Sequence, residues 1–341
     1  MSRRLVTMIT GGVMLVLLGV VGARLPVPYA ALGPGPTLDT LGSVNNEQII
    51  SVSGRTPNPV AGHLNLTTVS VTDHLDLFSA LRGWFDGEVS VVPREELFPP
   101  NQTPQQVDEQ NARDFAQSES DAVVAALREL HFAEKVVVQD LSDDSSPSRG
   151  RLKTGDVLET LDGVAVPDLK ALEKVLTGTA PGTTVTVDYV RAHKPASTTV
   201  TLAKATKRQG GALGVLVAMN PVAPYDVDIK VGEDIGGPSA GLMFALGILE
   251  KVGPTELTGG KFIAGTGTID PDGKVGPIGG IPLKMIAARD KGAVVFLVPA
   301  DNCAEARSAT PAGLRLVKVS TLHEAVGALG TLRGGGTPAG C

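Results

Sequence analysis

The chain has 341 residues, 42% of them apolar, which is enough for two or three domains that each bury a core. Its net charge of −6, without a basic stripe or interleaved aromatic and basic side chains, excludes nucleic acid as an expected partner. Its two cysteines, Cys303 and Cys341, exclude a disulfide scaffold and a thiolate metal cluster, and its five histidines lack ligand spacing, so we expect no metal and no cofactor.

The N-terminal segment predicts a membrane anchor. Residues 5–23 carry no charge and follow two arginines, and at about 1.5 Å per residue they match a hydrocarbon core of about 30 Å. The arginines predict that residues 1–4 form a cytoplasmic tip and that the rest lies outside the cytoplasmic membrane. The sequence Val21-Gly22-Ala23 also resembles a signal-peptidase site. We favour a retained single-pass anchor, because the apolar run is long and Arg24 and Pro26 follow the site unfavourably.

The next two segments are expected to support the rest of the chain. Residues 24–42 are rich in proline and glycine and predict an extended linker. Residues 43–128 predict a small α/β module, with short strands between 47 and 72 and helices at 75–85 and 104–130. We expect this N-terminal module to be a structural spacer.

Residues 129–205 have a different pattern. The run KVVVQDL predicts a strand, and Leu-Lys-Thr-Gly-Asp-Val-Leu, an Asp162-Gly163 turn and a helix from about Asp168 follow it. This order resembles a PDZ domain of the permuted bacterial type, and the resemblance implies binding of extended peptides, often C-termini, by strand addition. A rigid spacer without a ligand is the alternative. The groove is expected between one strand and one helix, at Val136, Val137, Val138 and Leu172.

The remainder alternates strands with helices, so the whole chain is expected to be an α+β multi-domain protein. Residues 206–330 predict an α/β domain with helices at 239–252 and 281–291. We expect the glycine-rich residues 331–341 to be a flexible tail. Cys303 is expected to be a small buried apolar residue, not a partner of Cys341.

Ser239 lies in the stretch GGPSAG, directly before a long apolar run. Glycine frees the backbone and proline fixes it, so the hydroxyl is expected at the mouth of a helix. One interpretation is a purely structural, glycine-rich helix start. A second is the G-x-S-x-G elbow of an esterase, with His323 as base and Asp301 as acid. The third is a serine activated by a lysine.

A lysine can take a serine proton only if its pKa falls from about 10.4 toward about 7–8. Burial in apolar surroundings has this effect, because the ammonium loses its hydration. Lys284 lies among apolar residues at the start of a predicted helix and is our candidate base. Four other lysines after Ser239 lie beside helix ends or turns, where we expect them in water: Lys251, Lys261, Lys274 and Lys291.

The helix mouth also suits stabilisation of an oxyanion. The first peptide N–H groups of a helix lack intrahelical partners and carry partial positive charge. Each such donor is typically worth about 3 kcal/mol to a transition state. The candidate pair is the N–H of Ser239 with that of Gly236 or Gly237.

Three motifs in order, GGPSAG, AGTGTI and GKVGPIGGIPLK, resemble the proteolytic domain of Lon-type serine proteases over roughly residues 210–325. The resemblance implies that Ser239 is the nucleophile, Lys284 is the base and Thr266 orients the lysine. Three departures leave the dyad intact but bear on the oxyanion loop and the substrate groove. Ile235-Gly236 stands where the family often has Lys-Asp, Thr268 where it has Glu, and Pro282-Leu283 where it has Lys-Glu before the lysine.

No G-x-x-x-x-G-K-[ST] phosphate loop occurs in the sequence, so we expect no ATP. An anchor, a PDZ domain and a Lon-like domain in this order resemble the single-pass Lon-like PDZ proteases of bacteria. The resemblance implies an ATP-independent endopeptidase that cuts unfolded, membrane or secreted polypeptides. It leaves the oligomeric state open, although Lon-like domains tend to form homo-oligomeric rings. A PDZ peptide-binding scaffold on a degenerate protease domain is the non-enzymatic alternative.

Overall fold

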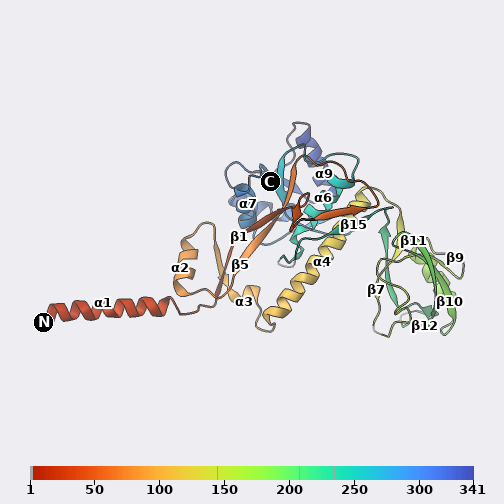
Figure 1. The fold of residues 1–341 in the computed structure, drawn as a ribbon, viewed down its shortest axis with the longest axis horizontal. Helices are drawn as coiled ribbons and strands as arrows, with labels where there is room; N and C mark the ends of the chain where they lie inside the picture. The colour runs from red at the N-terminus through yellow and green to blue at the C-terminus, as the bar shows by residue number, and fades with distance from the viewer. Residues whose placement is uncertain (1–2, 144, 207, 233–234) are drawn as a thin grey trace. The chain divides into compact units, whose positions relative to one another are not determined.

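A computed structural model describes residues 3–143, 145–206, 208–232 and 235–341. The chain divides into two compact units (Figure 1). The larger unit comprises residues up to 51, 57–126 and 228–341, and the smaller comprises 52–56 and 127–227. The mixed α and β content agrees with the predicted fold class.

Helix α1, Arg3–Gly22, is exposed along almost its whole length. Its mean hydropathy reaches 2.3, and it is the one helix of the described residues that is long and apolar enough to cross a membrane. An N-terminal signal sequence meets the same criteria. Residues 1 and 2 of the predicted cytoplasmic tip lie outside the described residues.

The larger unit is built on one six-stranded sheet with the order β20-β19-β16-β5-β1-β6. Strand β5 is parallel to β16, and β1 is antiparallel to both β5 and β6. The strands are β1 (Tyr29–Asp39), β5 (His63–Thr72), β6 (Ser90–Pro93), β16 (Phe262–Gly265), β19 (Val295–Pro299) and β20 (Arg315–Val319).

This sheet differs from the sequence-based domain boundaries. Residues 24–42 are not simply a linker, because most of them form β1. Residues 43–128 are not a separate module either, because β5 and β6 belong to the same sheet as the C-terminal strands. The physical reason is that β16 finds its hydrogen-bonding partner in β5, almost 200 residues earlier in the chain.

Two helices bring the candidate residues to the sheet. Every residue of α6, Gly241–Val252, is buried, and α7, Ile281–Asp290, contacts β1 and β5. The other helical segments that lie mainly in this unit are α2 (Leu77–Phe85), α3 (Arg94–Leu97), α4 (Pro104–Glu129), η1 (Pro238–Ala240), η2 (Ala300–Asn302), α8 (Cys303–Ser308) and α9 (Leu322–Arg333). Its short strands are β2 (Ser43–Val44), β3 (Glu47–Gln48), β17 (Thr268–Ile269) and β18 (Val275–Gly276).

The smaller unit packs one helix, α5 (Leu169–Gly178), on a second sheet with the order β11-β10-β8-β7-β14. Asp168 begins the helix by accepting a hydrogen bond from the N–H of Ala171. Because β14 belongs to this sheet, the predicted boundary at residue 205 is too early. The strands are β7 (Glu134–Leu141), β8 (Val157–Leu161), β9 (Val164–Ala165), β10 (Thr184–Arg191), β11 (Lys194–Thr201), β12 (Ala203–Lys204), β13 (Gly211–Ala212) and β14 (Val215–Pro221). Two further strands each include a point of the sequence where one unit ends and the other begins: β4 (Ile50–Ser53) and β15 (Asp226–Ile229).

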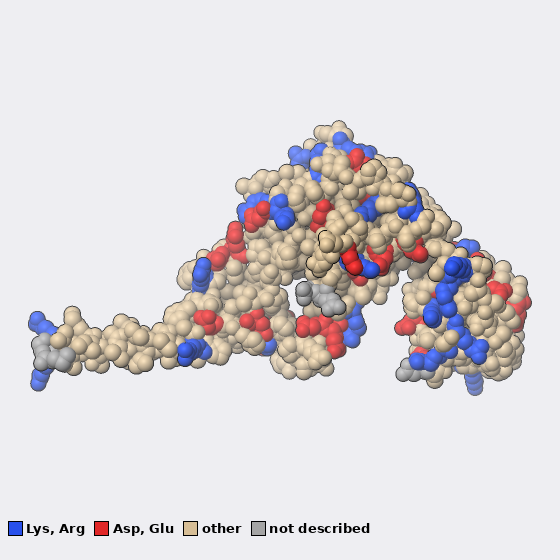
Figure 2. All heavy atoms as spheres, viewed as in Figure 1, with Lys and Arg blue, Asp and Glu red and all other residues tan. Residues whose placement is uncertain are grey.

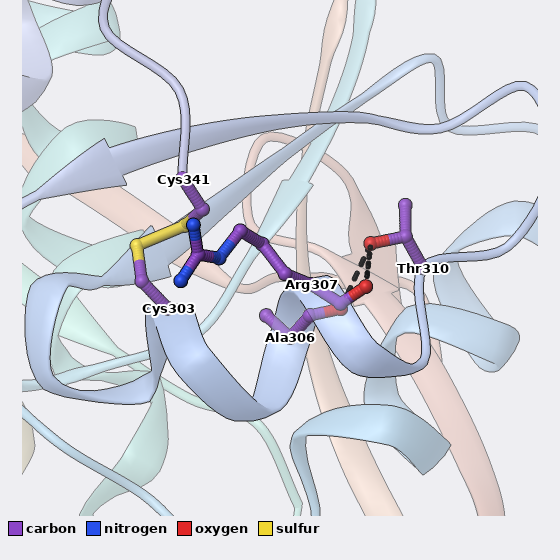
Figure 3. The surroundings of a disulfide bond; sticks show 5 residues. All are labelled: Cys303, Ala306, Arg307, Thr310 and Cys341. Carbon is purple, nitrogen blue, oxygen red and sulfur yellow. Dashed lines mark hydrogen bonds between the residues drawn. A yellow bond between two sulfur atoms is a disulfide. The ribbon is translucent and has the colours of Figure 1, made fainter.

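The C-terminal segment is fastened to the larger unit. Cys341 forms a disulfide with Cys303 at the start of α8 (Figure 3). The N–H of Lys318 in β20 donates to the carbonyl of Ala339, and Cys341 packs against an apolar cluster. Two expectations are therefore wrong: residues 331–341 are not a free tail, and the cysteines are paired. The last residues run beside β20. The glycine-rich sequence gives no sign of this packing.

We expect the disulfide to stabilise the larger unit. It closes a loop with a sequence separation of 38 residues, and the chain-entropy relation assigns such a loop about 4 kcal/mol. Cys303→Ser with Cys341→Ser should lower the melting temperature of the larger unit, measured by calorimetry. Reductant should have the same effect on the parent and none on the double variant, and an unchanged melting temperature in both experiments would contradict the expectation.

Candidate active site

Ser239 lies in the short helix η1, which leads directly into α6. Gly237 begins this turn with φ of 85°, a backbone conformation that favours glycine, and Pro238 follows it as the first helical residue. At Gly241, a Cβ atom would lie 2.7 Å from Cγ2 of Ile269 and 2.8 Å from Oγ of Ser118. Glycine and proline therefore hold the hydroxyl at the tip of a buried helix, as the sequence predicts.

Lys284 reaches the same place from α7. Gly280, with φ of 70°, begins that helix, and the lysine follows one turn later. Lys284 is only 3% exposed. Its Nζ atom donates to Oγ of Ser239 at 2.7 Å and to Oγ1 of Thr266 at 3.1 Å. The structure thus brings together three predicted residues that come from three separate motifs.

Thr266 links the lysine to the serine backbone. It follows β16 and is completely buried. Its hydroxyl donates to the carbonyl oxygen of Ser239 at 3.0 Å while it accepts from Lys284. The N–H of Gly267 donates to the same carbonyl at 2.9 Å. The residue is therefore placed where it can orient both the amine and the turn that carries the hydroxyl.

Burial lowers the pKa of Lys284 from 10.5 to about 8, because the ammonium loses hydration in this apolar setting. About one tenth of the amine is then neutral at pH 7, and about half at pH 8. Lys251, which we expected in water, is also buried, and burial lowers its pKa too. However, its Nζ is held by Oε1 of Gln48 and the carbonyl of Ile50. Contact with a hydroxyl, rather than burial alone, therefore distinguishes Lys284.

The three predicted oxyanion donors all line the cleft beside Lys284, but they are not equivalent. The N–H of Gly237 donates to the carbonyl oxygen of Asn111 in α4 at 3.0 Å. In this conformation it is not available to an oxyanion, so the prediction for Gly237 needs this correction. Gly236 and Ser239 remain the candidate donors.

Two residues that the sequence did not single out support the site. Ser118 in α4 donates its hydroxyl hydrogen to the carbonyl of Pro238 at 3.0 Å. The side-chain amide of Asn302 accepts from the N–H of Ile278 and donates to its carbonyl, both at 2.9 Å, which fixes the loop before α7. No motif marks either residue. The apolar periodicity of α4 is the signal that one face of this helix is buried, and Ser118 lies on that face.

A cleft of about 570 Å³ opens beside the serine. One wall is the second half of β5, and Phe115 of α4 also contributes. Strand β16 pairs with β5 as far as Leu66, so the cleft begins where this pairing ends. His323, the base of the esterase alternative, lies on the exposed side of α9, and Asp301 is exposed. Among the described residues that line the cleft, the base at hydrogen-bond distance from Ser239 is Lys284.

A second cavity, of about 590 Å³, lies in the smaller unit between α5 and β14. Leu172 lines it, as predicted, but Val136, Val137 and Val138 do not belong to its edge strand. They lie in β7, which pairs with β8 on one side and β14 on the other. A strand with both edges occupied cannot accept a ligand strand, so the groove strand is β14 instead.

A buried lysine and a helix-tip serine beside a cleft define a candidate hydrolase site of the serine type. Residues 223–328 match the model of the Lon protease (S16) C-terminal proteolytic domain, and residues 105–202 match that of a PDZ domain. The chain therefore combines a PDZ domain with a proteolytic domain of the Lon serine protease family.

A curated relative and two solved structures are similar to parts of the chain. Lon protease 2 of Bacillus subtilis (strain 168) is 34% identical over 105 residues, which are 30% of this chain and 18% of that protein. The PDZ domains of SdrC-like proteins from Listeria monocytogenes and Listeria innocua are each 22% identical. Each match covers 24% of this chain and has a TM-score of 0.23. The matches cover 86% of the Listeria monocytogenes chain and 92% of the Listeria innocua chain.

We expect the amine of Lys284 to titrate with a midpoint of about 8. The cause is desolvation, which disfavours the charged form, so the neutral amine should predominate above this pH. The measurement is the Cε chemical shift in protein labelled with [¹³C]lysine, with Lys284→Met to assign the signal. A midpoint close to that of an ordinary lysine, about 10.4, would contradict the expectation.

Proposed function

We propose that this protein is an ATP-independent serine endopeptidase anchored in the cytoplasmic membrane, with its catalytic unit outside. The observation that supports the proposal is the 2.7 Å contact between Nζ of Lys284 and Oγ of Ser239, made by an amine that is almost fully buried. A serine hydroxyl becomes a nucleophile when a base takes its proton, and a neutral lysine can act as that base.

The proposed reaction proceeds through an acyl-enzyme. Neutral Lys284 takes the hydroxyl proton as Oγ of Ser239 bonds to the carbonyl carbon of the peptide. The tetrahedral intermediate collapses, the carbon–nitrogen bond breaks and the lysine ammonium gives its proton to the leaving amine. Water then attacks the ester, Lys284 takes a proton from the water and returns it to Oγ, and the acid product leaves. The N–H groups of Ser239 and Gly236 are the proposed oxyanion donors, and Thr266 positions the amine.

An extended polypeptide is the proposed substrate. The cleft runs beside β5 from Leu66 to Val71, where backbone groups of a strand can pair with an incoming chain. Without an ATP-driven motor, the enzyme would cut segments that are already unfolded, in membrane or secreted proteins. The disulfide between Cys303 and Cys341 supports a location outside the cytoplasm, because such bonds persist in oxidising compartments.

Ser239→Ala and Lys284→Met should each lower kcat by at least about 1,000-fold, because the nucleophile and its base act as a unit. The assay is cleavage of a reduced, unfolded protein in the absence of ATP. Lys291→Met, which changes an exposed lysine at the end of α7, is the matched control and should retain the parent rate. The parent rate should rise with pH through about 8, since only the neutral amine can accept the proton.

Other outcomes would favour the alternatives. Parent activity in Lys284→Met, with loss of activity in His323→Ala, would support the esterase interpretation. Peptide binding without any turnover that depends on Ser239 would support a scaffold on a degenerate protease domain. Either outcome would contradict the serine–lysine proposal.

The groove between α5 and β14 is proposed to bind the C-terminus of a peptide. Leu169 lines this cavity and is 38% exposed, so Leu169→Asp should abolish binding without opening the core. The measurement is fluorescence polarisation with a library of labelled decapeptides that have free or amidated C-termini. Val164→Asp, at an exposed site on β9 that does not line the cavity, is the control. Equal binding by both variants would contradict the proposal.

A further inference from the structure

Helix α2, Leu77–Phe85, carries an unusual group of apolar side chains on its solvent face. Phe78 is 50% exposed, Leu81 38%, Trp84 53% and Phe85 89%. Phe78, Leu81 and Phe85 are spaced by three and four residues, so they share one face of the helix, with Trp84 at its edge. The opposite face is already occupied, because Ala80 and Gly83 are buried. We call the four exposed side chains the α2 face.

The position of α2 relative to the apolar helix α1 is fixed by direct contacts. The N–H of Val27 donates to the carbonyl of Leu75 at 2.9 Å, and Pro26 pairs with Asp76, the residue that caps α2. The ring of Phe78 lies against Gly22, where an added Cβ would be 2.9 Å from Cε2 of that ring. Gly22 is the last residue of α1. The α2 face therefore begins beside the end of α1 (Figure 1).

This contact sets the depth of α2 if α1 crosses a membrane. Residues 5–23 carry no charge, and Figure 2 shows the charged side chains of α1 only at its N-terminal end. At about 1.5 Å per residue, this stretch spans about 28 Å, close to the hydrocarbon thickness. Gly22 then lies at the boundary between hydrocarbon and headgroups, and Phe78 lies there with it.

We propose that α2 is an interfacial helix whose apolar face inserts into the phospholipid surface of the membrane that α1 crosses. The inference rests on the retained anchor of the proposed function. The tryptophan and phenylalanine side chains of the α2 face favour a lipid surface as partner, because amphipathic helices bury such side chains at the boundary of headgroups and acyl chains. Arg24, which follows α1, and Arg82 of α2 are both exposed, and basic side chains beside a membrane surface are attracted to lipid phosphates.

Two of the acidic groups near the start of α2 are bound within the protein. The carboxylate of Asp76 accepts from the N–H groups of Phe78 and Ser79, at 2.9 and 3.0 Å. Asp73 is bound by Arg94 through two hydrogen bonds, at 2.7 and 2.9 Å. The charge of Asp73 is thus paired with a guanidinium, and that of Asp76 is held at the N-terminus of α2 by peptide N–H groups.

The α2 face is also connected to the cleft. The ring of Trp84 packs edge-on against Tyr29, with centroids 5.5 Å apart. Tyr29 is the first residue of β1, and β1 pairs with β5, whose second half lines the cleft. A second attachment to the lipid would therefore hold the cleft at a fixed height above the membrane. The substrates favoured by this arrangement are unfolded segments close to the membrane surface.

Trp84 is the one tryptophan of the sequence, so its fluorescence reports on α2 directly. The experiment uses the full chain reconstituted in vesicles of phosphatidylcholine and phosphatidylglycerol. We expect emission shifted to the blue of that of N-acetyltryptophanamide, strong quenching by lipids with a nitroxide near the headgroup, and weak quenching by aqueous iodide. Leu81→Ser with Phe85→Ser should raise the iodide quenching constant about threefold. Val164→Ser, on an exposed strand of the smaller unit, should leave it unchanged.

Two results would overturn the inference, and they are distinguishable. If the chain floats with the vesicles but iodide quenches Trp84 equally in the parent and in the Leu81→Ser, Phe85→Ser variant, and nitroxide lipid quenches it in neither, α2 stays in water and only this inference fails. If the chain does not float with the vesicles, the anchor fails and the inference fails with it. Cleavage of a soluble unfolded protein should be the same for the parent and the Leu81→Ser, Phe85→Ser variant, which separates lipid docking from catalysis.

Discussion

The contact between the buried amine of Lys284 and the hydroxyl of Ser239 is the constraint that the packing of the larger unit must satisfy. Keeping Lys284 3% exposed requires apolar structure on all sides of it. The fully buried α6, the β16 strand end and α7 supply that structure. Glycine at 241 and 280 allows the close approach of these segments. The same burial that stabilises the fold lowers the pKa of the lysine, so packing and chemistry are one requirement.

The candidate site could be predicted from sequence because its information is local. Ser239 and Lys284 each lie in a short stretch with its own glycines and a proline, which determine the turn that presents the side chain. Thr266 is indicated by the resemblance of AGTGTI to the second of the three motifs of Lon-type proteases. The role of β1 could not be predicted in this way. Its sequence YAALGPGPTLD has the composition of a linker, yet it forms a strand because its prolines lie where the register with β5 shifts between Pro34 and Thr37. Proline is tolerated at such irregularities.

The errors outside the site have a common physical cause. Both β7 and β14 are apolar strands, and whether a strand has a free edge depends on neighbours that are distant in sequence. The expected groove strand β7 has both edges paired, and the cavity that Leu172 lines is bordered by β14 instead. The disulfide depends in the same way on the path of the last residues along β20. Local sequence patterns indicate which face of an element is apolar and where turns occur. Which strand has a free edge, and where a terminal segment packs, depend on pairing between residues that are distant in sequence.

Helix α4 connects the nucleophile segment to the rest of the chain. Ser118 holds the carbonyl of Pro238, and the carbonyl of Asn111 holds the N–H of Gly237. For Gly237 to stabilise an oxyanion, this second bond must break, which requires movement of α4 or of the segment before Ser239. Gly237 is only partly buried, so either water or a substrate oxyanion could replace the carbonyl of Asn111 as partner of its N–H. The bond to Asn111 therefore opposes recruitment of Gly237 as a third donor and leaves the N–H groups of Ser239 and Gly236 as the proposed pair.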